Sequence, residues 1–446
     1  MRDHGSFGPP SCAGGVKYRR RIVGSGRVRL ERIRLCKDKL PESLVFRKGA
    51  RTGRVFGHHD QILAALDLVK AALYGLSKRQ FIRSFKNENG LRVRVRQVVG
   101  DLSRLEQHAE RHDGRTGRVQ ARFGKYDNGG DLVETAFLTQ GLLAARQYFD
   151  RASPVEREIR ERATALWEGV EWAWYRMSPD SEVLYWHWSP DHAWHIRHPL
   201  IGWNETLIVY LLAVASPTHP VPASLYHTGW AGQSEHAVQY RRNWGRTTEG
   251  ERFTNGNTYL GIPLEVGVGN GGELFFTQFS FLGFDPRGRR DRYTNYARNN
   301  RSIARINHAY CVRNPRGHEG YGPACWGLSA GIHSGGGRPL PRDDNGTLCC
   351  SAALGAFPWT PQESMAALKH FYRELGRGTW GIYGFHDGFN AAQDWWEEIY
   401  MGLNQAQIVV MIENHRSNLV WNHMHGEPNL IRGLQRAGFQ GGDRRF

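Results

Sequence analysis

Helix signals recur after about residue 125, and strand-type alternation is scarce there. Ser153-Pro154-Val155-Glu156 has the form of a capping box with proline at the first helical position. Apolar residues from Ile159 to Trp174 then follow at helical spacing along one face. Thr360-Pro361-Gln362-Glu363 has the same form. Because at least five such helices are joined by long loops, the sequence predicts an all-α domain, either a bundle or a helical toroid.

Other helices and one strand pair can be placed from local signals. Asn204 is expected to cap a helix that Pro217 ends, and Asn390 to cap another over 391–403. The stretch 405–424 supplies a further helix. The stretch 272–285, GELFFTQFSFLGFD, is the best candidate for a short hairpin.

Charge and tryptophan divide the chain near Phe123. Residues 1–123 hold 28 Lys and Arg against 11 Asp and Glu, while the remainder holds 31 against 32. All 15 Trp lie in the remainder. We therefore expect residues 1–55 to form a poorly ordered basic leader, and 56–123 a divergent helical part. A basic leader is compatible with an anionic partner, but nucleic acid ranks last among the partners because the Trp-rich body is neutral.

The cysteines and the apolar runs argue against several classes of protein. Six Cys in 446 residues form no disulfide framework, and a Cys311–Cys325 pairing stays open at this point. The longest apolar run, 207–215, is too short to span a bilayer. The basic N-terminus lacks the apolar segment that a signal peptide needs.

Three carboxylates surround a glycine pair in the stretch KYDNGGDLVETAF, 125–137. Asp131 and Glu134 fit a helix cap and its partner, which explains them without chemistry. That reading leaves Asp127 and the Asn128-Gly129-Gly130 turn unexplained. Crowded carboxylates repel one another and raise one pKa, as a proton donor requires. The motif therefore indicates either a cap or an acid–base site.

The stretch 184–212 combines aromatic density with an acid. Tyr185, Trp186, Trp188, Trp194 and Trp203 precede Glu205, which stands at the start of a helix. Sugar rings stack their C–H faces on indole and need polar groups for their hydroxyls. Individually these Trp residues are more often core, but their density in a loop favours a carbohydrate cleft. His192, His195 and His198 are spaced three apart, but their surroundings argue against a metal, and we expect none.

A third acid, Asp387, stands in the aromatic loop WGIYGFHDGFN. Taken alone it is a turn residue. The Gly-rich stretch GYGPACWGLSAG, which contains Trp326, lacks the order of a phosphate-binding loop. Asp285-Pro286 is interpreted as structural or as the wall of a subsite.

Taken together, these stretches resemble the glucoamylase-like glycoside hydrolases of family 144, the β-1,2-glucanases. The segments that match are YDNGGDLVETAF, LYWHWSP, GWNETLIVYLL, GGELFFTQFSFLGFDPRG, NHAYCVRNP, GYGPACWGLSAG, DNGTLCCSAALGAF, WGIYGFHDGFN and IVVMIENHRSNLVW. They follow the order of the family over roughly 124–439. The resemblance implies an (α/α)6 toroid as a catalytic domain over 124–446. It also implies hydrolysis of β-1,2-linked glucan to sophorose or short sophoro-oligosaccharides, with inversion and without a metal or organic cofactor.

The resemblance implies that the functional acids of this chain are Asp127, Asp131, Glu134, Glu205 and Asp387, and we assign their roles as a hypothesis. Glu205 is the expected general acid, Glu134 the expected base or water-positioning group, and Asp131 its support. Asp127 and Asp387 are expected to hold sugar hydroxyls or the attacking water. The expected substrate-binding aromatic residues are Trp186, Trp188, Trp203 and Trp326.

Some features depart from the family, and other functions stay open. The basic leader matches no motif of the family, so it is either a divergent extension or the product of a disturbed reading frame or start site. The family predicts a periplasmic or secreted protein, whereas a chain without a signal peptide would be cytoplasmic. The alternatives to hydrolysis are transglycosylation on the same glucan and an inactive carbohydrate-binding relative.

Overall fold

The computed structural model describes residues 126–331, 333, 344–381 and 383–441. They all belong to one of two compact units of the chain, and the other unit, Tyr18–Leu91, lies outside the described residues. The leader expected over 1–55 and the helical part expected over 56–123 lie outside them as well.

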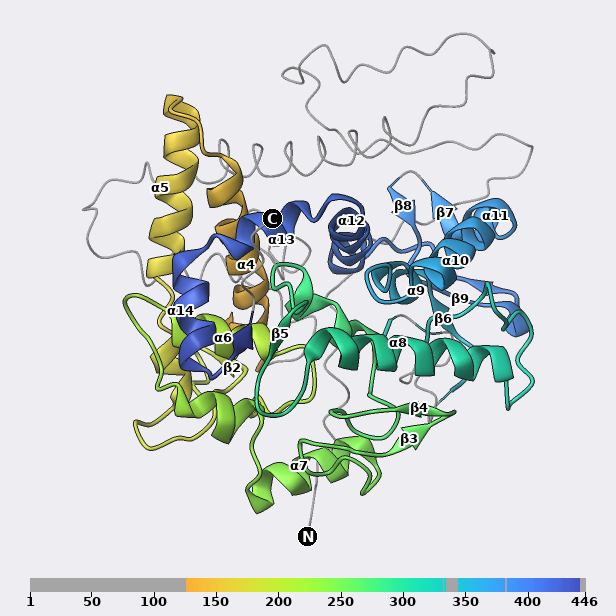
Figure 1. Cartoon of the computed structure of the whole chain (residues 1–446), viewed down its shortest axis with the longest axis horizontal. Helices are drawn as coiled ribbons and strands as arrows, with labels where there is room; N and C mark the ends of the chain where they lie inside the picture. The colour runs from red at the N-terminus through yellow and green to blue at the C-terminus, as the bar shows by residue number, and fades with distance from the viewer. Residues whose placement is uncertain (1–125, 332, 334–343, 382, 442–446) are drawn as a thin grey trace. The chain divides into compact units, whose positions relative to one another are not determined.

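Helices account for most of the regular structure in the described part of the chain (Figure 1). The α-helices are α4 (Leu132–Tyr148), α5 (Pro154–Glu168), α6 (Leu207–Ala215), α7 (Glu235–Gly245), α8 (Tyr296–Arg313), α9 (Cys350–Gly355), α10 (Pro361–Arg373), α11 (Gly376–Thr379), α12 (Gly402–Ser417), α13 (Leu419–His425) and α14 (Pro428–Arg436). Shorter helical turns are η5 (Trp172–Arg176), η6 (Tyr226–Trp230), η7 (Leu274–Thr277), η8 (Phe279–Phe281) and η9 (Ala391–Gln393). This helix-rich architecture agrees with the fold class predicted from the sequence.

The strands are short, and every pair is antiparallel. They are β1 (Gly130–Asp131), β2 (His187–Trp188), β3 (Thr258–Tyr259), β4 (Ile262–Pro263), β5 (Arg289–Arg290), β6 (Leu348–Cys349), β7 (Trp380–Gly381), β8 (Gly384–Phe385), β9 (Gly388–Asn390), β10 (Trp395–Trp396) and β11 (Gln440–Gly441). They form the pairs β1-β2, β11-β5, β3-β4 and β7-β8 and one three-stranded sheet in the order β10-β9-β6. These strands therefore join loops to one another and build no sheet core.

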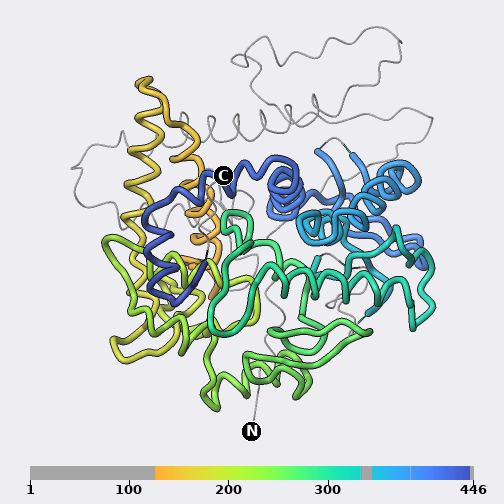
Figure 2. The backbone as a smooth tube through the Cα atoms, viewed as in Figure 1, coloured from red at the N-terminus to blue at the C-terminus, as the bar shows by residue number. Residues whose placement is uncertain are grey.

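Helix α6 lies at the centre of the core. All nine of its residues are buried, and it packs against α4 and α14. Gly433 of α14 permits this contact, because a Cβ atom there would lie 2.7 Å from the Cβ of Ala215 and 2.9 Å from the carbonyl oxygen of Leu211. The C-terminal helix α14 thus packs against a helix more than two hundred residues earlier in the chain (Figure 2).

Helices α4 and α5 pack against each other. Ser153 caps α5 by accepting a hydrogen bond from the Glu156 N–H at 3.3 Å, so the predicted cap is confirmed. Helix α5 ends at Glu168, however, and Trp174 lies in η5 rather than on the expected helical face.

Three local predictions are wrong. Thr360 makes no side-chain cap, because its hydroxyl donates back to the Ala356 carbonyl oxygen at 3.3 Å. The helix expected after Asn390 is absent among the described residues. After η9 the chain turns through Asp394, which has a φ of 47°, into β10. The stretch expected as a hairpin forms the two turns η7 and η8.

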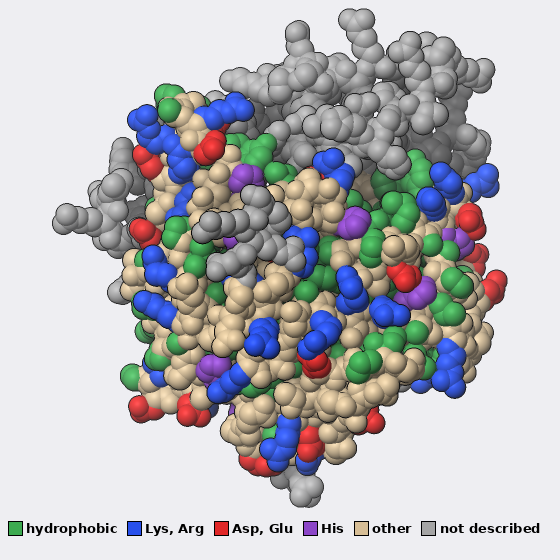
Figure 3. All heavy atoms as spheres, viewed as in Figure 1, with side chains coloured by type: hydrophobic (Ala, Val, Ile, Leu, Met, Phe, Trp, Pro, Cys, Tyr) green, Lys and Arg blue, Asp and Glu red, His purple; other side chains and the backbone are tan. Residues whose placement is uncertain are grey.

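Surface and cysteine features complete the description. No helix in the described part of the chain is both long and apolar enough to cross a bilayer. Acidic and basic side chains are interspersed on the face that Figure 3 shows, as the near-neutral composition of the body predicts. Cys311 and Cys325 are buried free thiols, so the pairing left open by the sequence is not formed in this structure.

Candidate active site

The loop that carries the first acids is joined to the Trp-rich segment by the ribbon β1-β2. Gly130 pairs with Trp188 and Asp131 with His187. The Leu132 N–H extends this contact by donating to the Trp186 carbonyl oxygen at 2.9 Å. Gly129 is required here, since a Cβ atom on it would lie 2.0 Å from the Trp188 carbonyl oxygen. Two motifs separated by more than fifty residues thus form one structure.

Asp131 caps helix α4, as its local sequence predicts. One of its carboxylate oxygens accepts hydrogen bonds from the Val133 and Glu134 N–H groups at 2.8 and 3.0 Å. The side chain is buried, and the Thr135 hydroxyl donates to its carbonyl oxygen at 2.6 Å. Asp131 therefore fixes the backbone from which Glu134 projects, and Glu134 itself is half-buried.

Asp127 faces His187 across the ribbon. Nε2 of the buried His187 ring accepts the Gly129 N–H at 3.1 Å and lies 3.6 Å from an Asp127 carboxylate oxygen. Because Nε2 acts as an acceptor, the ring proton belongs on Nδ1 in this arrangement. The histidine holds the glycine turn between Asp127 and Asp131, a role that the sequence analysis did not assign.

Glu205 lies in the turn before α6 and is half-buried, so it is not sealed in the core. Its carbonyl oxygen accepts a hydrogen bond from the Ser280 hydroxyl, and Ser280 Oγ accepts the Ile208 N–H at 3.1 Å. Asn204 folds the turn by accepting from the Thr206 N–H at 3.1 Å. The expected cap therefore acts as an Asn turn, and α6 begins at Leu207.

One segment supports both glutamates. Ser280 follows Phe279 in η8, and the Phe279 ring packs on Phe137 with ring centroids 5.3 Å apart. Phe137 is three residues after Glu134, and residues at that spacing are neighbours on a helix surface. Glu134 and Glu205, separated by 71 positions, are thus carried by elements that meet at η8.

Asp387 is buried immediately before β9. Asn404 of α12 donates its amide to the Asp387 carboxylate. Gly331 lies against the same side chain, because a Cβ atom there would lie 3.0 Å from an Asp387 oxygen and 2.6 Å from Cys349 Sγ. Cys349 is a small buried side chain in β6 that lies against the same glycine.

Asp387 is also linked to the segment that contains η7 and η8. Two residues before Gly331, the Ser329 hydroxyl accepts the Phe275 N–H at 3.2 Å. The Phe275 and Phe279 rings lie 5.0 Å apart. Residues 274–281, here called the aromatic hub, therefore contact Phe137 of α4, the turn that carries Glu205, and Ser329 in the segment that leads to Gly331.

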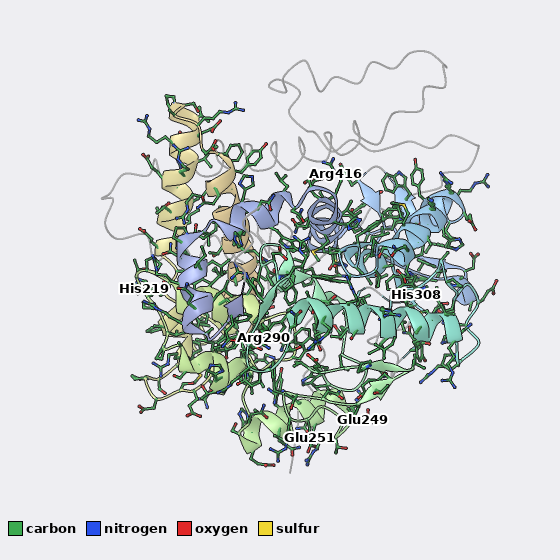
Figure 4. All side chains as sticks on the ribbon, viewed as in Figure 1. His219, Glu249, Glu251, Arg290, His308 and Arg416 are labelled. Carbon is green, nitrogen blue, oxygen red and sulfur yellow. The ribbon has the colours of Figure 1, made fainter. Side chains whose placement is uncertain are left out.

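Two of the four expected aromatic subsite residues are corrected. Trp203 is 1% exposed and stacks on Tyr296 at 5.9 Å with an angle of 8° between the ring planes. Trp326 is 0% exposed and packs edge-on against His308, which Figure 4 labels. Neither ring has a face free for a sugar, because both rings are buried and packed against core residues. Trp186 and Trp188 are half-buried and stay candidates.

The structure gives less support to the other candidate sites. Among the described residues no group of three or more His, Cys, Asp or Glu side chains is arranged to hold a metal ion. His195 instead stacks on Tyr126, and His198 bonds the Tyr240 hydroxyl at 3.2 Å. A small hollow lies between β5, α13 and α14; Asp285 lines it, but none of the acids expected in catalysis or substrate binding does.

The residues that the sequence analysis missed are supports. Ser280, Phe137 and His187 act through partners 58 to 142 positions away, and no local pattern announces such contacts. Glu273, a buried acid directly before the aromatic hub, was also passed over. The glycine pair before it, Gly271-Gly272, is the sequence signal that could have identified Glu273 as a candidate.

Comparison with known proteins gives a consistent family assignment. The Glycoamylase family model, described as "Putative glucoamylase", matches residues 197–428, about half of the chain. An exo beta-1,2-glucooligosaccharide sophorohydrolase (non-reducing end) of Parabacteroides distasonis is 51% identical over 327 residues, which are 73% of this chain and 45% of that protein.

Solved structures agree with that match. The crystal structure of a β-1,2-glucanase from Parabacteroides distasonis has a TM-score of 0.71 and 45% identity, covering 77% of this chain and 53% of its own. An endo-β-1,2-glucanase from Chitinophaga pinensis, in complex with sophorotriose and glucose, has a TM-score of 0.67 and 39% identity. The match covers 74% of this chain and 76% of that protein's chain. This chain spans about half the length of both Parabacteroides proteins.

Proposed function

The chain belongs to the glucoamylase-like family, with relatives of the glycoside hydrolase family 144 type, and from this premise we propose that it hydrolyses β-1,2-linked glucan. The relatives named above act on β-1,2-glucan or its oligosaccharides, which supports the choice of linkage. We further propose that the helices complete an (α/α)6 toroid and that the products are sophorose or short sophoro-oligosaccharides.

The observation that carries the proposal is the common support of the acids. Glu134 projects from a helix start fixed by Asp131, and Glu205 from a turn fixed by Ser280. Both supports meet at the aromatic hub. Catalysis by two carboxylates needs them held on opposite sides of one scissile bond. Rigid elements that share one packed segment meet this need better than free loops do.

In the proposed chemistry Glu205 protonates the glycosidic oxygen as the bond breaks. A water molecule attacks the anomeric carbon from the other face, and Glu134 removes its proton. The Glu134 carboxylate stands in the first turn of α4, where the helix dipole stabilises negative charge, as suits a base. Attack by water on the opposite face inverts the anomeric configuration.

Asp127 and Asp387 are assigned to substrate hydroxyls or to the attacking water. Both are buried; Asp387 accepts a hydrogen bond from the Asn404 amide, and Asp127 is held by the turn that His187 fixes through the Gly129 N–H. Buried and oriented carboxylates accept hydrogen bonds from sugar hydroxyls with defined geometry. The half-buried Trp186 and Trp188 complete the proposed sugar contacts.

The test is a panel of β-1,2-, β-1,3-, β-1,4- and α-1,4-glucans with product sizing. We expect reducing ends to accumulate with the β-1,2-glucan alone, together with sophorose or short oligosaccharides. Cleavage confined to the α-1,4-glucan would replace this proposal with glucoamylase activity. Constant reducing ends with lengthened products would identify a transglycosylase instead.

A further inference from the structure

An aromatic cluster that begins at the acid-bearing ribbon is partly exposed to solvent. Trp174 lies 6.0 Å from Trp188 and 6.1 Å from Trp194, measured between ring centroids. Trp194 in turn meets the edges of Tyr175 at 5.9 Å and Tyr185 at 6.3 Å. We call Trp174, Trp188 and Trp194 the aromatic shelf. Trp174 is 52% exposed, whereas the core residues Trp167 and Trp172, which precede it in the sequence, are 0% exposed.

The shelf is continuous with the candidate active site. Trp188 pairs with Gly130, the residue before Asp131. The loop from Ser189 to His195 is bound to the same turn, because Asn128 donates to Asp191 at 2.6 Å and the Ser189 hydroxyl donates to Asn128. The rings therefore begin at the acid-bearing ribbon and extend away from it.

A second aromatic contact borders the same loop. Tyr126, the residue before Asp127, is 37% exposed and stacks on His195 with ring centroids 3.6 Å apart. It also meets the edge of His192 at 5.0 Å. Exposed rings with adjacent imidazole and carboxylate groups match the surface of a sugar chain, which alternates C–H faces with hydroxyls.

The rings are held in place before any ligand arrives. Trp174 belongs to η5, whose end is tied by the Tyr185 N–H donating to the Tyr175 carbonyl oxygen at 2.8 Å. A rigid ring loses little conformational entropy on binding, so its contact contributes more of its energy to affinity. Contiguous exposed aromatic rings on fixed elements are also typical of an interaction site.

We propose that the aromatic shelf, which begins at the sugar contact Trp188, binds through Trp174 and Trp194 glucose units of the glucan chain beyond those held at the acids. The proposal rests on the proposed function and adds the segment of substrate that the shelf would bind. A chain long enough to reach Trp174 gains a stacking contact, whereas a short oligosaccharide held only at the acids does not. The shelf therefore sets the preference for chain length, acting on KM and not on kcat.

The experiment compares Trp174→Ala with the wild type on a long linear β-1,2-glucan and on sophorotriose. We expect KM for the long glucan to rise roughly 3- to 10-fold, with kcat unchanged and both constants for sophorotriose unchanged. Trp174→Phe, which keeps a flat ring, should recover most of the loss. The matched control is Trp380→Ala on β7, an indole 40% exposed outside the shelf, which should behave as the wild type does.

The outcomes separate this proposal from the proposed function. If the wild type cleaves β-1,2-glucan and Trp174→Ala has the same KM, the shelf proposal is overturned and the proposed function stands. If the wild type cleaves no β-1,2-glucan, the function fails, and calorimetric titration with the same glucan decides the shelf. If the wild type binds the glucan and Trp174→Ala binds it more weakly, the shelf proposal stands. If the wild type does not bind the glucan, the shelf proposal is overturned. An equal KM effect on sophorotriose would also contradict the outer position of Trp174.

Discussion

The Gly129 N–H donates a hydrogen bond to Nε2 of His187 at 3.1 Å. This contact crosses the ribbon β1-β2 and fixes the turn between Asp127 and Asp131. Both partners are buried, so water cannot replace the bond if it is lost. The shape of the acid-bearing loop thus depends on a histidine that takes no part in the proposed chemistry.

Replacement of this histidine should lower activity by misplacing Asp127. We expect His187→Phe to reduce kcat/KM roughly 5- to 100-fold, because a buried donor left without an acceptor costs about 1–3 kcal/mol. His187→Gln supplies an acceptor and should recover part of the loss. Kinetics on β-1,2-glucan, with a melting curve for each variant, measure the effect. An unchanged kcat/KM in a folded His187→Phe variant would remove His187 from the account, and His370→Gln on α10 serves as control.

Trp203 should behave as a core residue and not as a sugar contact. We expect Trp203→Phe to lower the free energy of unfolding by about 1–3 kcal/mol, since the stack on Tyr296 is reduced. The KM of the folded variant should stay within twofold of the wild type, while Trp186→Ala should raise KM. Denaturant unfolding and kinetics together check both variants. A raised KM without a loss of stability would return Trp203 to the substrate site.

Glu427 should be among the most sensitive positions for stability. It is 0% exposed, pairs with Arg146 of α4, accepts from the Gln147 amide at 2.9 Å and caps α14 through the Asn429 N–H. Its loss leaves Arg146 largely buried without its carboxylate, so we expect Glu427→Ala to cost about 3 kcal/mol or more. Glu158→Ala, which breaks the exposed Arg162–Glu158 pair, should cost at most about 0.5 kcal/mol. Equal losses in urea unfolding would contradict the structural role of Glu427.

The buried cysteines should be inert. Burial raises the pKa of the Cys325 thiol to about 12 and that of Cys311 well above its usual range. Both thiols therefore stay protonated throughout the neutral range, and protonated buried thiols react slowly. We expect dithiothreitol to leave the melting temperature unchanged, and thiol labelling at these positions to need denaturant. A melting temperature that falls on reduction would show a Cys311–Cys325 disulfide instead.

Sequence reasoning succeeded where the physical cause was local. The caps at Asp131 and Ser153 depend on residues two or three positions away, and both are present. It failed where tertiary contacts decided the outcome. Thr360 is buried, and its hydroxyl bonds back to the preceding turn instead of capping. The Trp395-Trp396 stretch, which has a helical pattern, pairs with β9 as a strand.

The candidate site shows the same division. The acids could be selected because they stand in compact motifs beside helix starts. Their supports could not, because Ser280 meets Glu205 across 75 positions and Gln140 reaches the Phe279 carbonyl oxygen across 139. Burial separates Trp203 from Trp186, although both belong to the same aromatic stretch. Only the packed structure reveals that difference.

Hydrolysis with Glu205 as proton donor is tested by the release of reducing ends from purified linear β-1,2-glucan, measured side by side for the wild type and Glu205→Gln. We predict steady release by the wild type and a loss of at least about 100-fold in the variant, because a neutral amide cannot donate the proton that the leaving oxygen needs. Comparable turnover by both proteins would contradict it.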